Sequence, residues 1–439
     1  MNTEKSKTNT LFRVTKLAAV VLLCAAFSPP AHADKTVPDG AVISEWNENT
    51  IAAITAGPGG YGNPLQATRL LAMVHVAMHD AVNAVLPQYE RYEFAGSDSK
   101  ANPTAAAAAA AHRVLSLAFP AQLSDLDAKL ADSMQPLPNG SRERRALDLG
   151  RAAADAIWTR RLNDGSDQFG EYTPGNQSGQ WQFTPPYDGF IFAPAWQFVD
   201  TWGLNTADQF RVPSAPPALS SALYAAEYNE VKSKGHITSA TRTADETAYG
   251  KFWYEFSDIG WNRITRVAAT GHALDLAQSA RLFALVNIAL ADSYIAGWDS
   301  KQHYDFWRPI TAIRAGETDG NPNTTPDPAW EPLMITPPIQ DYPSTHSVLG
   351  DAAAEILGST FGDATAFSFT STTAANPNVE VRSFTSLTQA ANENGDSRVM
   401  VGIHFRSAVE TGQHLGREIG RHVYQNLLRP LDSANKHAK

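Results

Sequence analysis

The chain has 439 residues, of which 43% are hydrophobic and 18% charged, a composition typical of a folded globular protein and not of a disordered, collagenous or coiled-coil chain. Its 35 Lys and Arg residues against 45 Asp and Glu give a formal net charge of −10, which argues against a nucleic-acid binder that depends on counterion release. Any anionic ligand must therefore be attracted by a local cluster of cations.

Residues 1–33 have the order of a secretory signal peptide. Basic residues precede the apolar run Leu17–Phe27, and Ala31–Ala33 supplies a cleavage site. The run is too short to cross a bilayer, so no membrane span is expected after cleavage. The chain's one cysteine, Cys24, lies in this run, where a lipoprotein signal is the weaker alternative. We expect a secreted or periplasmic protein without disulfides, Cys-ligated metals or a cysteine nucleophile.

The rest of the chain predicts helices more strongly than strands. Residues 34–64 are rich in Gly, Pro and Asn and predict an extended segment. From Leu65 to Val85, apolar residues recur at three- and four-residue steps, the pattern of an amphipathic helix. Similar patterns predict further helices over residues 103–118, 122–134, 142–162, 217–234, 243–257, 273–303, 345–360 and 404–428.

Two long connections separate these helices. Residues 164–215 are rich in Gly, Pro and aromatic residues and predict an ordered loop packed on the helices, and residues 315–343 form a second, Pro-rich connection. Because strand-like alternation is scarce, we predict an all-α fold with long loops; with the family resemblance given below, we expect two packed helical bundles. We divide it into an N-terminal half, 34–240, and a C-terminal half, 241–439, that carries the functional site.

The first segment with candidate chemistry runs from Lys301 to Pro309. On a continuous helix, seven residues turn the chain by about 700°, which brings Arg308 to within about 20° of Lys301. The spacing therefore predicts two cations on one helix face. Taken alone, such a pair is also compatible with a solvated charged stripe.

The second segment, Tyr342–Ser347, precedes the apolar helical run Val348–Leu357. Its Pro-Ser-Thr sequence predicts a helix N-terminus, whose free backbone N–H groups and dipole attract anions. His346 would lie in the first turn, able to transfer a proton. Simple helix capping is the alternative interpretation.

The third segment, Ser397–Phe405, contains a second cation–histidine pair. Six helical residues rotate the chain by about 600°, so Arg398 and His404 converge only if the chain bends between them. Gly402 is the expected hinge. Together, the three segments would supply three cations, a hydroxyl at a helix N-terminus and two histidines, a combination suited to a tetrahedral or trigonal-bipyramidal oxyanion.

These residues resemble the three-part signature shared by vanadium-dependent haloperoxidases, type 2 phosphatidic acid phosphatases and bacterial class A acid phosphatases. The matching residues are Lys301, Arg308-Pro309, Pro343-Ser344-x-His346, Ser397-Arg398 and His404. The likeness to the haloperoxidase branch extends over roughly residues 295–415. It includes Phe306–Pro309, Ile313-Arg314, Asp319-Gly320, Asp327–Trp330 and Tyr342–Ser344.

The resemblance implies a vanadate cofactor. Its oxygens would be held by Lys301, Arg308, Ser344, the backbone N–H of Thr345, and Arg398. His404 would be the axial vanadium ligand and His346 the acid/base residue, so these two are the implied catalytic residues. Hydrogen peroxide would then oxidise a halide ion to a hypohalous species that halogenates a small organic acceptor. No nucleic-acid partner is implied, and a homodimer is left open.

Two alternatives use the same cation cluster. In a secreted acid phosphatase of the same superfamily, His404 would be the nucleophile of a phosphohistidine intermediate and His346 would protonate the leaving alkoxide. A non-catalytic phosphate- or vanadate-binding protein would need only the cations. Inhibition of the protein by vanadate would favour the phosphatase.

Two positions depart from the signature. Thr345 stands where Gly is common, so a β-branched side chain crowds the oxyanion while the backbone N–H remains. Ala408 stands where many members carry an Asp four residues after the ligand histidine. A carboxylate that orients His404 must therefore come from elsewhere or be missing.

Other candidates are weaker. His75 and His79 lie four residues apart beside Asp80, a spacing able to bind a metal, but no third ligand is evident. Trp298 and Ile339 are candidates for residues that tune halide selectivity. The remaining polar candidates are predicted to face away from the site or to form a polar helix face: His303, His414, Arg417 and His422.

Overall fold

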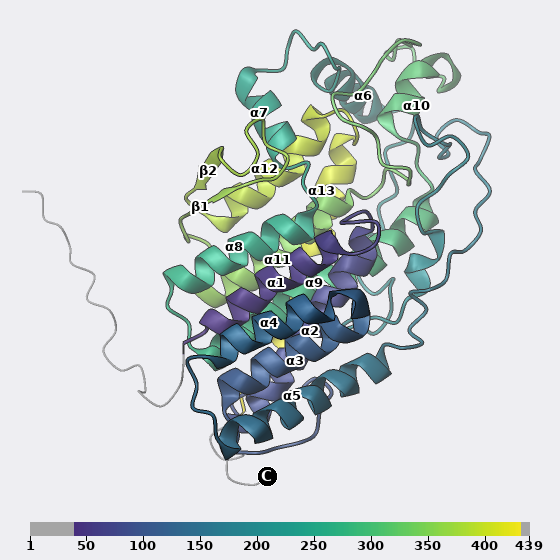
Figure 1. Cartoon of the computed structure of the whole chain (residues 1–439). Coiled ribbons are helices and arrows are strands. Elements are labelled where there is room, and N and C mark those ends of the chain that lie inside the picture. Colours follow the sequence, from purple (N-terminus) through teal and green to yellow (C-terminus); the bar gives the residue numbers. More distant parts are fainter. Residues whose placement is uncertain (1–38, 432–439) are drawn as a thin grey trace, which may run out of the picture. The chain divides into compact units, whose positions relative to one another are not determined.

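The described residues, 39–431 of the chain in a computed structural model, are mostly helical, which confirms the all-α prediction (Figure 1). The predicted signal peptide, its cleavage site and Cys24 lie outside the described residues. The described residues belong to one compact unit, residues 38–439. The division into halves at residue 240 stays a prediction.

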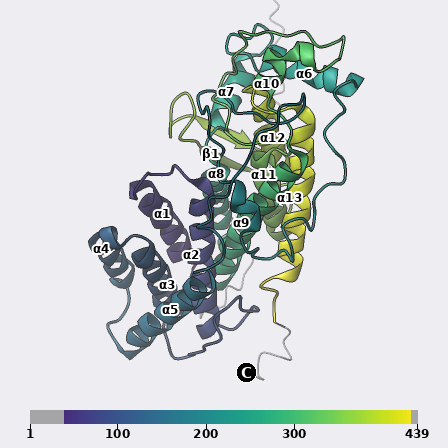
Figure 2. The ribbon, with the colours of Figure 1, turned by 90° about the vertical axis from the view of Figure 1, so that its right-hand side faces the viewer.

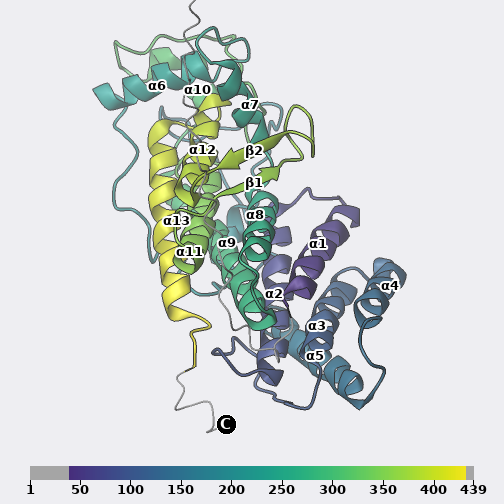
Figure 3. The same cartoon turned by 90° about the vertical axis from the view of Figure 1, so that its left-hand side faces the viewer.

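Five helices form the N-terminal bundle: α1 (Ala41–Ala56), α2 (Pro64–Val85), α3 (Pro103–Ala118), α4 (Leu123–Met134) and α5 (Ser141–Arg160). Figures 2 and 3 show them side by side. The alanine tract 105–111 is buried and lets α5 approach α3 closely. At Gly150 of α5 even one methyl group would lie 2.4 Å from the Ala106 carbonyl, so this contact requires glycine.

The prediction of an extended segment over residues 34–64 is wrong where α1 forms. The Gly and Pro residues that suggested a loop lie outside the helix, at Gly40 before it and at 57–62 after it. Within the helix, Val42, Ile43, Trp46 and Ile54 are buried at helical spacing. Averaging over the whole segment hid this pattern, because the turn residues at both ends dominate its composition.

The second bundle is built from α8 (Ser257–Gly271), α9 (Leu276–Tyr304), α11 (Thr345–Phe361), α12 (Leu387–Met400) and α13 (Arg406–Asn426). Helix α11 packs against α9 and α13 (Figure 3). Gly412, Gly416 and Gly420 repeat every four residues on α13, and a Cβ at any of them would lie within 2.6 Å of a backbone oxygen at positions 344–352. This glycine stripe lets the start of α11 approach α13 closely.

Helix α9 joins the two bundles, because it packs on α2 and on α11. It is long and apolar enough to cross a membrane, but it is almost entirely buried inside the protein, as in the core helix of a large domain. Its C-terminal end, at Lys301, reaches the predicted site. The arrangement confirms the prediction of two packed helical bundles.

Shorter elements cover one end of the second bundle: α6 (Ala222–Lys234), α7 (Ala244–Phe252) and α10 (Pro309–Arg314) (Figure 1). A small antiparallel hairpin, β1 (Phe367–Thr370) with β2 (Val381–Phe384), pairs Phe367 with Phe384. The hairpin and helices α8, α10 and α12 were not predicted from the sequence. The two long connections are loops, as predicted, with only the short 3₁₀ turns Pro194–Phe198 and Gly316–Thr318.

Candidate active site

The predicted site residues converge from five elements of the C-terminal part. Lys301 lies in the last turn of α9, Arg308 precedes α10, Thr345 begins α11, Arg398 lies in the last turn of α12, and His404 precedes α13. A cavity of about 620 Å³ opens at this point. Lys301, Arg308, Thr345, His346, Arg398 and His404 all line it.

Lys301 and Arg308 meet, but not on one continuous helix as predicted. Helix α9 ends at Tyr304, and Asp305 adopts a left-handed conformation with φ of 46°. The chain then turns, and Arg308 is the residue before α10, where Pro309 occupies the first helical position. The convergence of the two cations therefore comes from a turn between two helices and not from helical periodicity.

Both cations hold the loop that precedes α11. The Lys301 ammonium donates to the carbonyl oxygens of Gln340 (2.7 Å), Asp341 (3.1 Å) and Pro343 (2.6 Å). Arg308 Nε donates to the Ile339 carbonyl at 2.6 Å. The backbone of residues 339–343 is thus fixed by the same two side chains that line the cavity.

The site carries an excess of buried positive charge. Lys301, Arg308 and Arg398 are each 1% exposed, and the carboxylate that lies beside Arg308 is Asp341. Burial lowers the pKa of Arg308 to about 10 and that of Arg398 to about 9. Burial and repulsion by Arg308 and Arg398 also lower the pKa of Lys301 well below its usual value. Burying charges is costly unless they are paired, so this cluster favours a bound anion of more than one charge.

The N-terminus of α11 presents polar groups that the protein itself does not satisfy. Ser344 is the N-cap residue, yet its side chain makes no capping hydrogen bond. Its hydroxyl and that of Thr345 are buried without a hydrogen-bond partner among the described residues, as is Arg398 Nε. Simple capping by Ser344 is therefore wrong. Orphaned donors at a helix N-terminus beside three cations suit an oxyanion.

The Thr345 side chain fits because α9 has no side chain opposite it. A Cβ at Gly297 would lie only 3.2 Å from the Thr345 methyl group. Thr345 is thus accommodated by Gly297, and it lines the cavity; the crowding of an oxyanion by its side chain stays a prediction.

His346 lies in the first turn of α11, as predicted, and faces the cavity. Its Nε2 is 3.2 Å from the Glu255 carbonyl. Because a carbonyl only accepts, Nε2 carries the proton of the neutral ring and Nδ1 is left as a proton acceptor. Burial, followed by repulsion from Arg398, lowers the pKa of His346 well below its usual value, so the ring is neutral at pH 7. This side chain can therefore act as a base.

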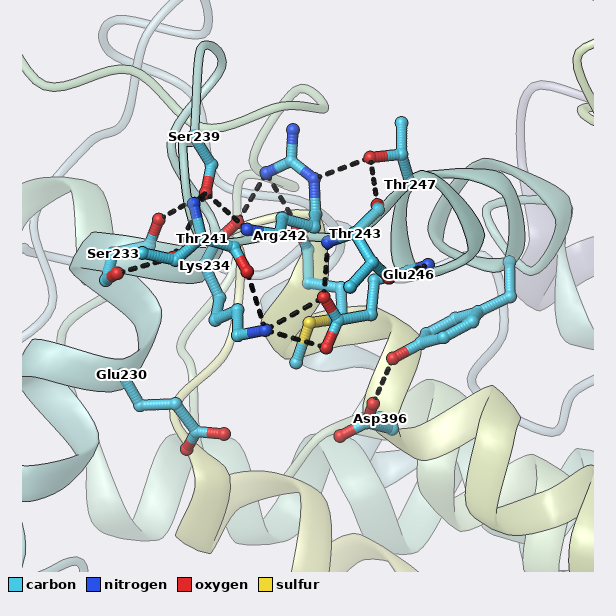
Figure 4. A network of polar contacts seen from close by, with 12 residues as sticks. Glu230, Ser233, Lys234, Ser239, Thr241, Arg242, Thr243, Glu246, Thr247 and Asp396 are labelled. Carbon is cyan, nitrogen blue, oxygen red and sulfur yellow. Dashed lines mark hydrogen bonds and ion pairs between the residues drawn. The ribbon is translucent and has the colours of Figure 1, made fainter.

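Arg398 and His404 converge because the chain bends at Gly402, as predicted. Helix α12 ends at Met400, and Gly402 has φ of 84°, a conformation that side chains disfavour. The bend is held from outside by Arg242, whose polar network is shown in Figure 4. Arg242 donates to the carbonyl oxygens of Met400 (3.3 Å) and His236 (2.8 Å). Asp396 of α12 pairs with Arg406 at 2.6 Å.

Replacing Gly402 by alanine should destabilise the protein by at least about 1–3 kcal/mol, the usual cost of a strained backbone conformation. A Cβ at this position would also lie 2.6 Å from the Gly235 carbonyl oxygen. Urea unfolding monitored by circular dichroism would measure the change. Gly271→Ala is the matched control, because it ends α8 with open space around it, and it should shift stability by less than about 0.5 kcal/mol. Equal effects of the two substitutions would contradict the role of the bend.

His404 lies between Arg308 and Asp341. Its Nδ1 is 2.9 Å from Asp341 Oδ1, and Arg308 Nη1 is 2.9 Å from its Nε2 and 3.4 Å from its Nδ1. Burial, with repulsion by Arg308, lowers the pKa of His404 well below its usual value. Burial raises the pKa of Asp341 to about 7, although Arg308 and Lys301 oppose this shift.

Asp341 is the site residue that sequence reasoning missed. The sequence shows that Ala408 supplies no carboxylate, but it does not show which residue takes that role. Asp341 directly precedes the Tyr342–Ser344 stretch that carries the family resemblance, and this adjacency was the available signal. Its contact with His404 depends on how two distant segments meet, which spacing does not reveal.

The other side of the cavity is apolar. Aromatic and proline side chains from the long loop, α9 and the second connection line it: Tyr187, Phe190, Phe192, Trp298, Pro337 and Pro338. Ile339 also lines the cavity, and the Trp298 indole donates to the Phe192 carbonyl at 3.2 Å. The cavity thus joins a polar, positively charged floor to an apolar wall.

The weaker candidates for metal binding, His75, His79 and Asp80, lie outside the site. His75 Nε2 is 2.8 Å from Asn47 Nδ2, and Asp80 accepts hydrogen bonds from three backbone N–H groups at positions 92–94. Among residues 39–431, no group of three His, Cys, Asp or Glu residues is placed to hold a metal ion. His75 and His79 are buried side chains of the N-terminal bundle, and His303 is exposed.

Comparison with known sequences identifies the C-terminal part. Residues 281–433 match the family described as the VCPO second helical-bundle domain. The chain is 29% identical to the vanadium chloroperoxidase of Curvularia inaequalis, over 71% of this chain and 64% of that protein. It therefore spans slightly less than two thirds of the length of this relative.

Solved structures share the fold across almost the whole chain. A bacterial vanadium-dependent iodoperoxidase matches with a TM-score of 0.74 and 27% identity, covering 90% of this chain and 97% of that one. The holo form of a bacterial vanadium-dependent chloroperoxidase matches with a TM-score of 0.69 and 18% identity, covering 89% and 97%. The fold predicted from the three motifs is confirmed.

Proposed function

We propose that this chain, whose fold and C-terminal helical bundle are those of the vanadium-dependent haloperoxidases, is a vanadate-dependent haloperoxidase that uses hydrogen peroxide to oxidise a halide. The observation that carries the proposal is the meeting of three buried cations, two histidines and a helix N-terminus at one cavity. The unpartnered Ser344 hydroxyl and Arg398 Nε fit a tetrahedral or trigonal-bipyramidal oxyanion such as vanadate.

Each site residue has a proposed role. Lys301, Arg308 and Arg398 neutralise the oxyanion, and Ser344 with the backbone N–H of Thr345 orients it. His404 binds the metal through a neutral ring nitrogen, and His346 accepts a proton at Nδ1. When bound, vanadate would supply a Lewis-acidic centre that activates peroxide toward the halide.

The apolar wall supports an organic acceptor with an electron-rich, apolar ring. Such a molecule would bury its ring against Phe190, Phe192 and Trp298, close to the cations that hold the cofactor. Halogenation would then take place within the cavity.

We expect Phe190→Ala to raise KM for an aromatic acceptor several-fold, with little change in kcat for bromide oxidation. Phe190 is 49% exposed, so its loss removes only part of the about 1.5–3 kcal/mol that a fully buried Phe contributes. Steady-state kinetics with monochlorodimedone and a larger phenol would measure KM and kcat separately. Phe169→Ala is the control, since Phe169 is 87% exposed on the same loop and does not line the cavity. Identical kinetics for all three proteins would show that the acceptor reacts outside the cavity.

The deciding experiment compares two activities of the purified protein. Halogenation of monochlorodimedone with peroxide and each halide is measured after chelation and after orthovanadate addition, with p-nitrophenyl phosphate hydrolysis alongside. Halogenation that requires vanadate supports the proposal. Phosphate ester hydrolysis that vanadate inhibits would assign the same residues to a phosphatase, and binding without turnover would leave only an oxyanion-binding protein.

Export of the protein from a bacterial cytoplasm is a separate proposal. It rests on the basic N-terminal segment, the apolar run Leu17–Phe27 and the small residues Ala31 and Ala33. N-terminal sequencing of the protein from periplasmic and culture-fluid fractions tests it, with Asp34 expected as the first residue. A protein recovered intact from the cytoplasm would contradict it.

A further inference from the structure

The structure places an unexpected carboxylate behind the histidine proposed as the metal ligand. Ala408, where a carboxylate would follow the family pattern, is fully buried, and its carbonyl accepts a hydrogen bond from the Ser344 N–H at 2.8 Å. A methyl group at this position cannot accept a hydrogen bond from the His404 ring. The carboxylate beside the ring comes instead from Asp341, with 2.9 Å between Oδ1 and Nδ1.

Asp341 is held firmly in this position. Its side chain is fully buried, its N–H donates to the Phe306 carbonyl at 2.9 Å, and its own carbonyl accepts from Lys301. The neighbouring carbonyls of Ile339 and Gln340 are bound by Arg308 and Lys301. The loop therefore has little freedom to move the carboxylate away from His404.

The contacts of His404 select one tautomer of its neutral ring. Arginine has no acceptor, and Arg308 Nη1 lies closer to Nε2 (2.9 Å) than to Nδ1 (3.4 Å), so Nε2 presents its lone pair. The proton is then on Nδ1, 2.9 Å from Asp341 Oδ1, a buried carboxylate oxygen that has no hydrogen-bond partner among the described residues and is therefore the available acceptor. The Nε2 lone pair then faces Arg308 at the cavity, where it would be available to hold vanadium.

We propose that Asp341 is the positioning residue for His404: it accepts the Nδ1 proton, fixes the ring and keeps Nε2 free to bind vanadium, in place of the carboxylate absent at Ala408. This inference rests on the proposed function, since it assigns the orientation of the metal ligand. Asp341 itself does not line the cavity. Its position in the loop before α11, and not on α13, also ties the ligand to the two cations that hold the oxyanion.

The tautomer can be measured on the wild-type protein without vanadate. With ¹⁵N-labelled histidine, long-range ¹H–¹⁵N correlation spectra at pH 7 distinguish protonated from unprotonated ring nitrogens, and the spectrum of His404→Gln assigns the His404 signals. We expect a protonated Nδ1 and an unprotonated Nε2. A ring protonated at Nε2 overturns the proposal, whatever the activity of the enzyme.

Vanadate binding to substituted proteins supplies the second test. We expect Asp341→Ala to weaken vanadate affinity about 10–100-fold, the usual cost of losing a partner that orients a metal ligand. Asp341→Asn should weaken vanadate affinity less, because the amide oxygen of Asn can still accept a hydrogen bond from Nδ1. Glu227→Gln is the matched control: it removes another buried carboxylate, one that accepts from Ser407 Oγ at 2.8 Å, without touching the ring.

Whether Asp341→Ala weakens or strengthens vanadate binding distinguishes a positioning role of Asp341 from a purely electrostatic one. Removing a negative charge beside the cations should strengthen binding of any anion, so Asp341→Ala should bind phosphate as tightly as the wild type or more tightly. Weaker vanadate binding with undiminished phosphate binding, measured by calorimetry on protein shown to be folded by circular dichroism, supports the proposal. Equal or tighter vanadate binding overturns it. A wild-type protein that does not prefer vanadate to phosphate would instead contradict the proposed function.

Discussion

His404→Ala should abolish vanadate-dependent halogenation, because it would remove the proposed metal ligand. The three cations and the N-terminus of α11 would remain and would still bind an oxyanion. We therefore expect vanadate affinity to fall by more than the about 10–100-fold that follows loss of an outer-shell partner, to a value close to that for phosphate. Turnover should be undetectable at vanadate concentrations that saturate the wild type.

Calorimetric titration with vanadate and with phosphate measures both affinities. The control is His414→Ala, an exposed histidine on α13, which should bind vanadate like the wild type. If His404→Ala keeps a vanadate affinity far above its phosphate affinity, His404 is not the metal ligand.

The second large effect is expected for His346→Ala, which should lower the halogenation rate and leave vanadate affinity almost unchanged. The His346 ring has a lowered pKa, so it is a neutral base at pH 7. Its one ring proton is on Nε2, which donates to the Glu255 carbonyl, so Nδ1 can accept a proton. Loss of a positioned acid–base group costs about 10²–10⁴-fold in rate. Vanadate affinity should change little, because the cations and His404 hold the cofactor in the proposed site.

Steady-state halogenation rates at saturating vanadate, with affinities from calorimetry, separate these two quantities. His303→Ala is the matched control, since this exposed histidine lies two residues after Lys301 and outside the cavity. A His346→Ala protein with a wild-type kcat would remove His346 from the mechanism. A protein that fails to bind vanadate would make His346 a structural residue of the cofactor pocket.

Several features of the protein follow from the sequence because they depend on short-range rules. The start of α11 at Thr345 follows from a Pro-Ser-Thr sequence before an apolar run. The bend between Arg398 and His404 follows from the helical rotation and from Gly402, the one residue between them that readily adopts positive φ. The helical character of most of the chain follows from apolar periodicity. In each case the residues that decide the outcome are neighbours in the chain.

The same rules failed where the chain turns unexpectedly. The periodicity argument placed Lys301 and Arg308 on one helix, but Asp305 ends α9 with a left-handed conformation and redirects the chain. The two cations nevertheless meet, because both bind the carbonyl oxygens of residues 339–341. The turn brings the two residues together, and their contacts with a distant loop fix where the two side chains lie.

The orientation of His404 was decided only by the tertiary structure. Arg308 and His404 are 96 residues apart, and Asp341 reaches the ring from a third segment. Which distant segments meet depends on how α9, α11 and α13 pack, for example on the glycine stripe that lets α11 approach α13. Sequence alone determined the types of group present: cations, histidines and a helix N-terminus. Packing determined which carboxylate holds the ligand histidine, because no local rule couples Asp341 to a ring on another segment.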